Sequence, residues 1–116
     1  MSDSVLRAKS KEFAKNIVFL CRKMKQNGVE GALINPLLRC GTSVGANVHE
    51  AQYAQGTKDF ISKFEIALKE CNESEYWLEL LFETNSLTEA DFKDLGSKCI
   101  ELRRMLVSSV TTLKSK

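Results

Sequence analysis

The sequence has few residues that interrupt helices and no long uncharged apolar run. Among 116 residues there are one proline and six glycines, so helices must break at few points. The first 15 residues carry six charged side chains, a pattern unlike a signal peptide or a membrane-spanning segment. We therefore expect a cytoplasmic protein with no membrane partner.

Residues typical of enzyme and metal sites are also scarce. His49 is the only histidine and no Glu-x-x-His pair occurs, which excludes the di-iron site of some helical bundles. Cys21, Cys40, Cys71 and Cys99 form no Cys-x-x-Cys pair, and we expect them to be reduced, buried and too far apart to converge on zinc. We expect no catalytic residue, metal, cofactor or small-molecule substrate, and hence no enzyme.

The composition is that of a folded protein with a core. Hydrophobic residues make up 43% of the chain and charged residues 28%, which argues against disorder. A chain of this length usually forms one domain, which we expect to cover residues 1–116.

Apolar residues recur every three to four positions in four successive stretches, which predicts four amphipathic helices. The expected helices cover about residues 4–27, 33–55, 57–85 and 88–114. Short connections favour antiparallel neighbours, so the predicted fold is all-α, an antiparallel up-down-up-down four-helix bundle.

Residues that favour helix ends lie at the expected boundaries. Ser4, Thr57 and Thr88 suit N-caps, and Pro36 suits the first turn of the second helix after Asn35. Gly28 suits the end of the first helix.

The second helix has an unusually small core-facing set. Its members are Leu37, Cys40, Gly41, Val44, Val48 and Ala51. Glycines within a helix cost about 1 kcal/mol each relative to alanine. Close packing against a neighbouring helix is the expected compensation.

Charge is unevenly distributed along the chain. Residues 1–28 hold seven Lys/Arg against two Asp/Glu, whereas residues 57–86 hold three against seven. A basic stripe follows one face of the first helix, with two arginines added from the fourth: Arg7, Lys11, Lys15, Arg22, Lys25, Arg103 and Arg104. Two interpretations are open: the stripe contacts the phosphates of RNA or DNA, or it is a solvated helix face.

A second group of apolar residues lies off the expected core stripes. It comprises Phe19, Ile66, Trp77, Leu80, Ile100 and Val107. Contiguous apolar surface usually marks an interaction site, which favours a subunit interface. The alternative is that these residues widen the core.

Between Arg39 and Trp77 the chain carries a recognisable pattern. It reads Arg-Cys-Gly-Thr-Ser-Val-Gly-Ala-Asn-Val-His-Glu-Ala over residues 39–51, followed by Ala-Leu-Lys-Glu-x-x-Glu-x-x-Tyr-Trp-Leu over residues 67–78. This resembles the bacterial four-helix-bundle proteins encoded in intervening sequences of 23S ribosomal RNA genes. The polar positions of that family's second-helix motif are matched by Arg39, Ser43, Asn47 and Glu50. His49 and Ala51 depart from the family's usual alanine and glycine.

The resemblance implies a bundle that assembles with itself, commonly as a pentamer, without known catalysis. A similar bundle is the accessory variability determinant of diversity-generating retroelements, which binds nucleic acid. For the four polar motif residues two roles are open, an inter-helix network that fixes register or contact with a ligand or partner.

The leading hypothesis is a non-enzymatic homo-oligomeric scaffold or accessory factor that contacts nucleic acid through its basic face. The alternative is a protein–protein interaction module without nucleic-acid contact, in which the acidic third helix meets a basic partner.

Overall fold

Four helices account for most of the chain in the computed structural model, which describes residues 2–116 and the side chains of residues 4–116. Their bounds are α1 Ser2–Gln26, α2 Gly31–Ala51, α3 Thr57–Glu83 and α4 Glu89–Lys114. Met1, the first residue of the expected domain, lies outside the described residues. No strand occurs within residues 2–116, so the chain is all-α as predicted.

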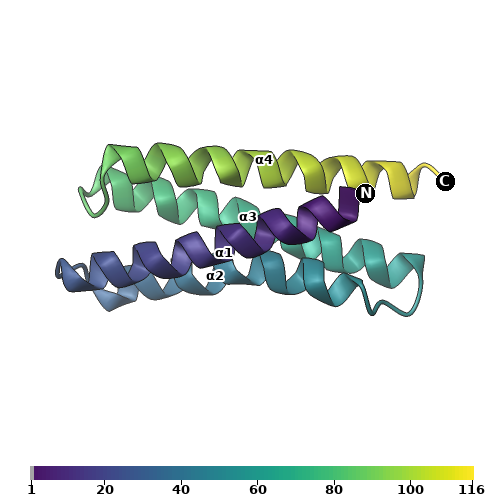
Figure 1. The fold of residues 1–116 in the computed structure, drawn as a ribbon, viewed down its shortest axis with the longest axis horizontal. Helices are drawn as coiled ribbons and strands as arrows, with labels where there is room; N and C mark the ends of the chain where they lie inside the picture. Colours follow the sequence, from purple (N-terminus) through teal and green to yellow (C-terminus); the bar gives the residue numbers. More distant parts are fainter. Residues whose placement is uncertain (1) are drawn as a thin grey trace.

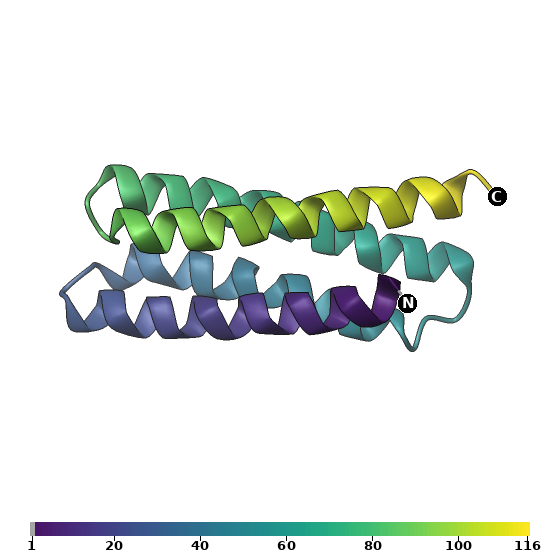
Figure 2. The same ribbon diagram turned by 45° about the horizontal axis from the view of Figure 1, so that its top comes forward.

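The helices run up, down, up and down along a rod of 48 × 21 × 19 Å (Figure 1). Each helix packs beside the next in the chain, and α4 returns to α1 to close the bundle. Turning the view shows α1 and α2 as one pair and α3 and α4 as the other (Figure 2). At the end that holds both termini, α3 diverges from α4 in both views. The predicted antiparallel bundle is therefore confirmed.

One continuous core runs the length of the rod. It is built from the apolar stripes of all four helices, with Phe13, Ile17, Val44, Phe64 and Leu102 among its least exposed members. All six residues expected on the core face of α2 are buried. Burial of such side chains supplies most of the stability of a helical bundle, because helices in proteins are stabilised mainly by packing of their apolar face rather than by intrinsic helix propensity.

Glycines on α2 allow α1 and α2 to approach closely. A Cβ added to Gly41 would lie 2.9 Å from two Ile17 carbons, and one added to Gly45 would lie 3.1 Å from the Ser10 carbonyl oxygen. Distances this short leave no room for a methyl group without movement. The close packing expected around these glycines is therefore present.

Two of the helix ends are closed by left-handed residues. Gly28 follows α1 with φ of 83°, and Asn85 follows α3 with φ of 60°. After α1, the Val29 N–H donates to the Met24 carbonyl at 3.0 Å, which is the long bond of a Schellman motif. After α3, the Ser86 N–H makes the equivalent bond to the Leu81 carbonyl at 2.8 Å.

Two of the expected helix starts and one expected cap differ from the structure. Helix α1 begins at Ser2, ahead of Ser4. Helix α2 begins at Gly31 after Glu30 as N-cap, so Pro36 lies inside the helix and Asn35 is not a cap. Gly56 occupies the N-cap of α3, and Thr57 is the first helical residue. For α4, the Thr88 hydroxyl accepts from the Asp91 N–H at 3.1 Å, as its sequence favours.

Helix α2 also ends earlier than the expected residue 55. It stops at Ala51, and the following backbone forms tight turns in which Tyr53 donates to the Glu50 carbonyl. Asp59 of α3 then accepts from the Gln55 N–H at 3.1 Å, which fixes the connection to the start of α3. Four apolar residues of α3 and α4 are half-buried at the edge of the core: Phe60, Phe82, Phe92 and Leu113.

Candidate functional site

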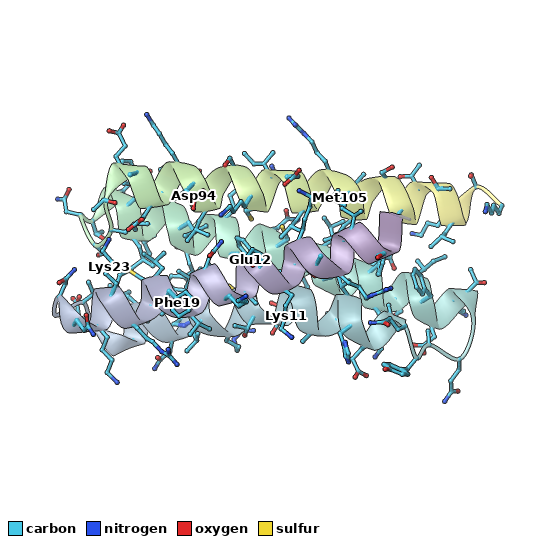
Figure 3. The ribbon with its side chains drawn as sticks, in the orientation of Figure 1. Lys11, Glu12, Phe19, Lys23, Asp94 and Met105 are labelled. Atoms are coloured by element: carbon cyan, nitrogen blue, oxygen red, sulfur yellow. The ribbon has the colours of Figure 1, made fainter. Side chains whose placement is uncertain are left out.

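The basic residues of α1 form an outward-facing stripe along the helix. At 100° per residue, Arg7, Lys11, Lys15, Arg22 and Lys25 occupy the sector away from the core. All are exposed except Arg7, which is half-buried. From the first to the last the stripe spans about 27 Å at 1.5 Å per residue. Figure 3 shows Lys11 on this helix.

Most charges of the α1 stripe have no acidic partner. Lys15 lies 3.6 Å from Glu12, with both side chains more than half exposed. Among residues 4–116, Arg7, Lys11, Arg22 and Lys25 take part in no ion pair. An exposed pair such as Lys15–Glu12 is weak, so the stripe keeps a positive field.

The two arginines expected to extend the stripe from α4 have different surroundings. Arg103 is half-buried and donates to Glu75 of α3 at 2.6 Å. That hydrogen bond raises the pKa of Arg103 above its ordinary value. Arg104 is exposed and lines a groove together with Arg7. Arg104 therefore lies near Arg7 at the same groove, whereas Arg103 is bound to Glu75 of α3.

The groove beside Arg7 and Arg104 has a volume of about 1180 Å³. It opens where α3 diverges from α4, and its apolar side is formed by residues of α2, α3 and α4: Val48, Ala51, Phe60, Phe64, Met105 and Leu113. Sequence reasoning missed this groove, because periodicity places residues on a helix face but does not predict where two helices separate.

The four motif residues lie on the flank of α2, and only Arg39 contacts α3 through its side chain. Arg39 Nη2 donates to Glu73 Oε2 at 2.6 Å, and Nη1 lies 3.6 Å from Glu70. Ser43 donates to the carbonyl of Arg39 at 2.7 Å, and Asn47 donates to the carbonyl of Ser43 at 2.8 Å.

These bonds of Ser43 and Asn47 remain within α2. Glu50 is exposed and has no ion pair among the described side chains. The four side chains are therefore not bonded to one another as a register-fixing network requires. Arg39 links two helices, while Ser43 and Asn47 satisfy backbone groups of their own helix.

The apolar residues expected at a subunit interface fall on three helices. Phe19, Ile66 and Val107 are 59%, 38% and 44% exposed, whereas Trp77, Leu80 and Ile100 are half-buried. Trp77 packs against the core and donates from Nε1 to Glu73 at 3.3 Å. Phe19 on α1 stands apart from this group, because its neighbours one helical turn away are polar.

Most acidic side chains of α3 form ion pairs with neighbouring helices. Glu65 pairs with Lys114 at 2.7 Å, Glu75 with Arg103 at 2.6 Å, and Glu70 and Glu73 with Arg39. The negative charge of this helix therefore ties α3 to α2 and α4.

The four cysteines are reduced and buried. Cys71 and Cys99 face each other with their sulfurs 3.4 Å apart, and each thiol lies 3.2 Å from the other's carbonyl oxygen. This contact lowers the pKa of Cys71 and raises that of Cys99. Burial raises the pKa of the Cys21 thiol from 9.0 to about 11. A thiol whose pKa is raised by burial, as at Cys21, stays neutral near pH 7 and is a poor nucleophile.

The described part of the chain holds neither a cluster of metal ligands nor a membrane-spanning helix. Within it, no three His, Cys, Asp or Glu side chains come together as ligands for a metal ion. None of the helices found there combines the length and apolar character needed to span a lipid bilayer. His49 is exposed and lies against Tyr53, with ring centroids 5.6 Å apart.

Comparison with known proteins places the whole bundle among relatives. Residues 2–108 match the sequence model of a family described as 23S rRNA-intervening sequence protein. The chain is also similar to a crystal structure from Bacteroides thetaiotaomicron VPI-5482, described as a protein with unknown function from the S23 ribosomal protein family. The two share 42% identity and a TM-score of 0.92, over 96% of this chain and 99% of that chain. None of the curated proteins compared with the chain shows a significant match.

Proposed function

The chain belongs to the 23S rRNA-intervening sequence protein family, and on that premise we propose that it is a non-enzymatic scaffold or accessory factor that binds nucleic acid through the basic face of α1. The proposal describes a cytoplasmic, single-domain bundle that acts as a homo-oligomer. The resemblance described above implies a pentamer. Of the apolar residues expected at the interface, Phe19, Ile66 and Val107 are exposed, and we propose Ile66 and Val107 for the subunit contact because the neighbours of Phe19 one helical turn away are polar.

The unpaired cations of α1 are the single observation that carries this proposal. Arg7, Lys11, Arg22 and Lys25 extend along one helix with no acidic partner among the described residues. Lys and Arg side chains bind phosphates and release condensed counterions, which gives an affinity that depends on salt and little on sequence. A homo-oligomer presents several copies of the stripe, and linked weak sites raise the effective affinity.

RNA is the first nucleic acid to test. The family description refers to an intervening sequence of 23S rRNA, and the similar crystal structure is described within an S23 ribosomal protein family. Both descriptions belong to those proteins, and they are the reason for choosing RNA as the first probe for this chain.

The alternative, an acidic α3 that meets a basic partner, has less support. Four glutamates of that helix are already paired with Arg39, Arg103 and Lys114. A basic partner would have to compete with these contacts, whereas phosphates would meet the α1 stripe without displacing any of them.

A charge-removal variant tests the proposed function. In fluorescence anisotropy with labelled RNA at low salt, Lys11→Gln/Arg22→Gln/Lys25→Gln is expected to bind at least about tenfold more weakly than the wild type, because three phosphate contacts are lost. Circular dichroism should remain unchanged, since all three side chains are exposed.

The matched control removes three exposed lysines from other helices. Lys58→Gln/Lys69→Gln/Lys93→Gln changes the net charge equally, and its affinity is expected to stay within about threefold of the wild type. Equal losses in both variants would show that net charge alone matters and would remove α1 as the binding face. Absence of wild-type binding at low salt would reject the proposed function.

A further inference from the structure

Phe19 is a large exposed aromatic side chain beside the basic stripe, about 40° around the helix from Lys15 and about 60° from Arg22. It is 59% exposed and belongs neither to the core nor to the half-buried residues packed against it. One helical turn before it lie Lys15 and Asn16, and one turn after it lie Arg22 and Lys23. Among the described residues it forms no aromatic pair. Its ring is thus open to solvent and flanked by cations.

This environment does not suit an apolar subunit contact. Such contacts need contiguous apolar surface. The nearest other exposed large apolar residue on α1 is Val5, which is 14 positions away or about 21 Å along the helix. Phe19 lies between Lys9 and Lys23, which pair with Glu101 and Asp91 of α4, so it is level with the part of α4 between those two acids, and Val107 lies beyond that part.

Cations outnumber acids around Phe19 on α1, because Lys15, Arg22 and Lys23 lie within one turn of it whereas Glu12 lies two turns before it on the same side. Arg22 is exposed and has no ion pair among residues 4–116, and Lys15 is paired only weakly with Glu12. Lys23 is 2.9 Å from Asp91. On α4, Asp94 is itself paired with Lys98 at 3.3 Å (Figure 3 labels Phe19 and Asp94). A phosphate chain passing along α1 would therefore meet Lys11, Lys15, Arg22 and Lys25, with the ring beside them at the level between Lys15 and Arg22.

We propose that Phe19 is a stacking platform for an unpaired base, so that the α1 face binds a single-stranded polynucleotide in preference to a duplex. The inference rests on the proposed nucleic-acid function and adds its ligand class. Sites for single-stranded nucleic acid combine two parts. Cations follow the phosphate backbone of the strand, and aromatic rings stack on its bases. In a duplex the bases stack on one another and pair, so their faces are not available to Phe19.

Tyr76 provides an internal comparison. It is 58% exposed, nearly the same as Phe19, and lies on α3. Its neighbours one helical turn away include Glu73 and Glu79. Phosphates would be repelled there, so aromatic exposure without flanking cations should not create a single-strand site.

The test compares Phe19→Ala with Tyr76→Ala and with the conservative variant Phe19→Tyr. Full-length proteins are titrated into a labelled single strand of roughly 12 nucleotides, as RNA and as DNA, and into the same strands annealed to their complements. Phe19→Ala should weaken single-strand binding about tenfold and leave duplex binding within about twofold. Tyr76→Ala and Phe19→Tyr should both match the wild type on every probe.

The salt dependence separates stacking from charge. Phe19→Ala should keep the wild-type slope of affinity against salt, because no phosphate contact is lost. The inference is overturned if Phe19→Ala weakens duplex and single strand equally, weakens neither, or changes the molar mass measured by light scattering. The last outcome would assign Phe19 to a protein contact. If Phe19→Ala binds like the wild type and only the removal of Lys11, Arg22 and Lys25 abolishes binding, the proposed nucleic-acid function stands and the stacking role of Phe19 is rejected.

Discussion

Gly41 of α2 lies directly against Ile17 of α1, with no space for a methyl group between them. A Cβ on Gly41 would lie 2.9 Å from both Cγ atoms of Ile17 and 3.3 Å from its Cβ. Ile17 is completely buried and branched at Cβ, so its side chain has little freedom to rotate away. The spacing of α1 and α2 therefore depends on glycine at this position.

Gly41→Ala is expected to destabilise the protein despite the higher helix propensity of alanine. Overpacking in a core typically costs about 1–3 kcal/mol, more than the roughly 1 kcal/mol that alanine contributes in a helix. The free energy of unfolding, measured by urea denaturation followed by circular dichroism, should fall.

Gly96 of α4 is the control for this change. Nothing lies within 4 Å of a Cβ built there, so Gly96→Ala should raise the free energy of unfolding by up to about 1 kcal/mol. If both substitutions raise the free energy of unfolding, the close approach of Gly41 to Ile17 is contradicted.

Cys21 gives the stability of the bundle a dependence on alkaline pH. Burial raises its pKa from 9.0 to about 11, so the folded protein holds the thiol neutral at pH values where the unfolded chain ionises it. The stabilising contribution is complete below pH 9 and is lost as pH rises toward 11. We expect a loss on the order of 2 kcal/mol from this residue.

The measurement is the free energy of unfolding between pH 8 and pH 11, compared with the Cys21→Ala variant, since other groups titrate in the same window. The variant should start less stable but lose less stability across this range. Parallel curves would contradict a neutral, buried Cys21.

Self-association is a separate prediction with its own test. Light scattering of the wild type should give a multiple of the 13.0 kDa subunit mass, with five copies implied by the resemblance. Charge placed in the apolar contact, as Ile66→Glu/Val107→Glu, should lower the mass toward one subunit because a buried unpaired carboxylate is costly. Val5→Glu, at a similarly exposed position, should not. A wild-type mass of 13.0 kDa at high concentration would remove the interface.

The bundle could be predicted from sequence because one physical rule governs it. Apolar periodicity identifies the buried face of each helix, and residues such as Ile17, Val44 and Leu102 are buried where that rule places them. Helix ends were less predictable. Pro36 indicates that a helix start is near, but α2 begins five residues earlier, at Gly31, and Pro36 lies inside its second turn.

Apolar periodicity does not predict which polar side chains pair between helices. The pairing of Arg39 with Glu73 and of Arg103 with Glu75 depends on the rotation and vertical offset of neighbouring helices. Hydrophobic periodicity does not determine this rotation or this offset closely enough to predict which side chains meet. The sequence alone therefore groups Arg103 with the proposed nucleic-acid residues, although its guanidinium donates to Glu75 of α3.

The salt dependence of RNA binding tests the central claim most directly. The affinity of the wild-type protein for a labelled single strand is measured by anisotropy across a series of salt concentrations. Each phosphate contact contributes about −0.7 to the slope of log affinity against log salt, so four unpaired cations predict a slope of about −3 or steeper. A slope near zero, or no binding at the lowest salt, would contradict the account.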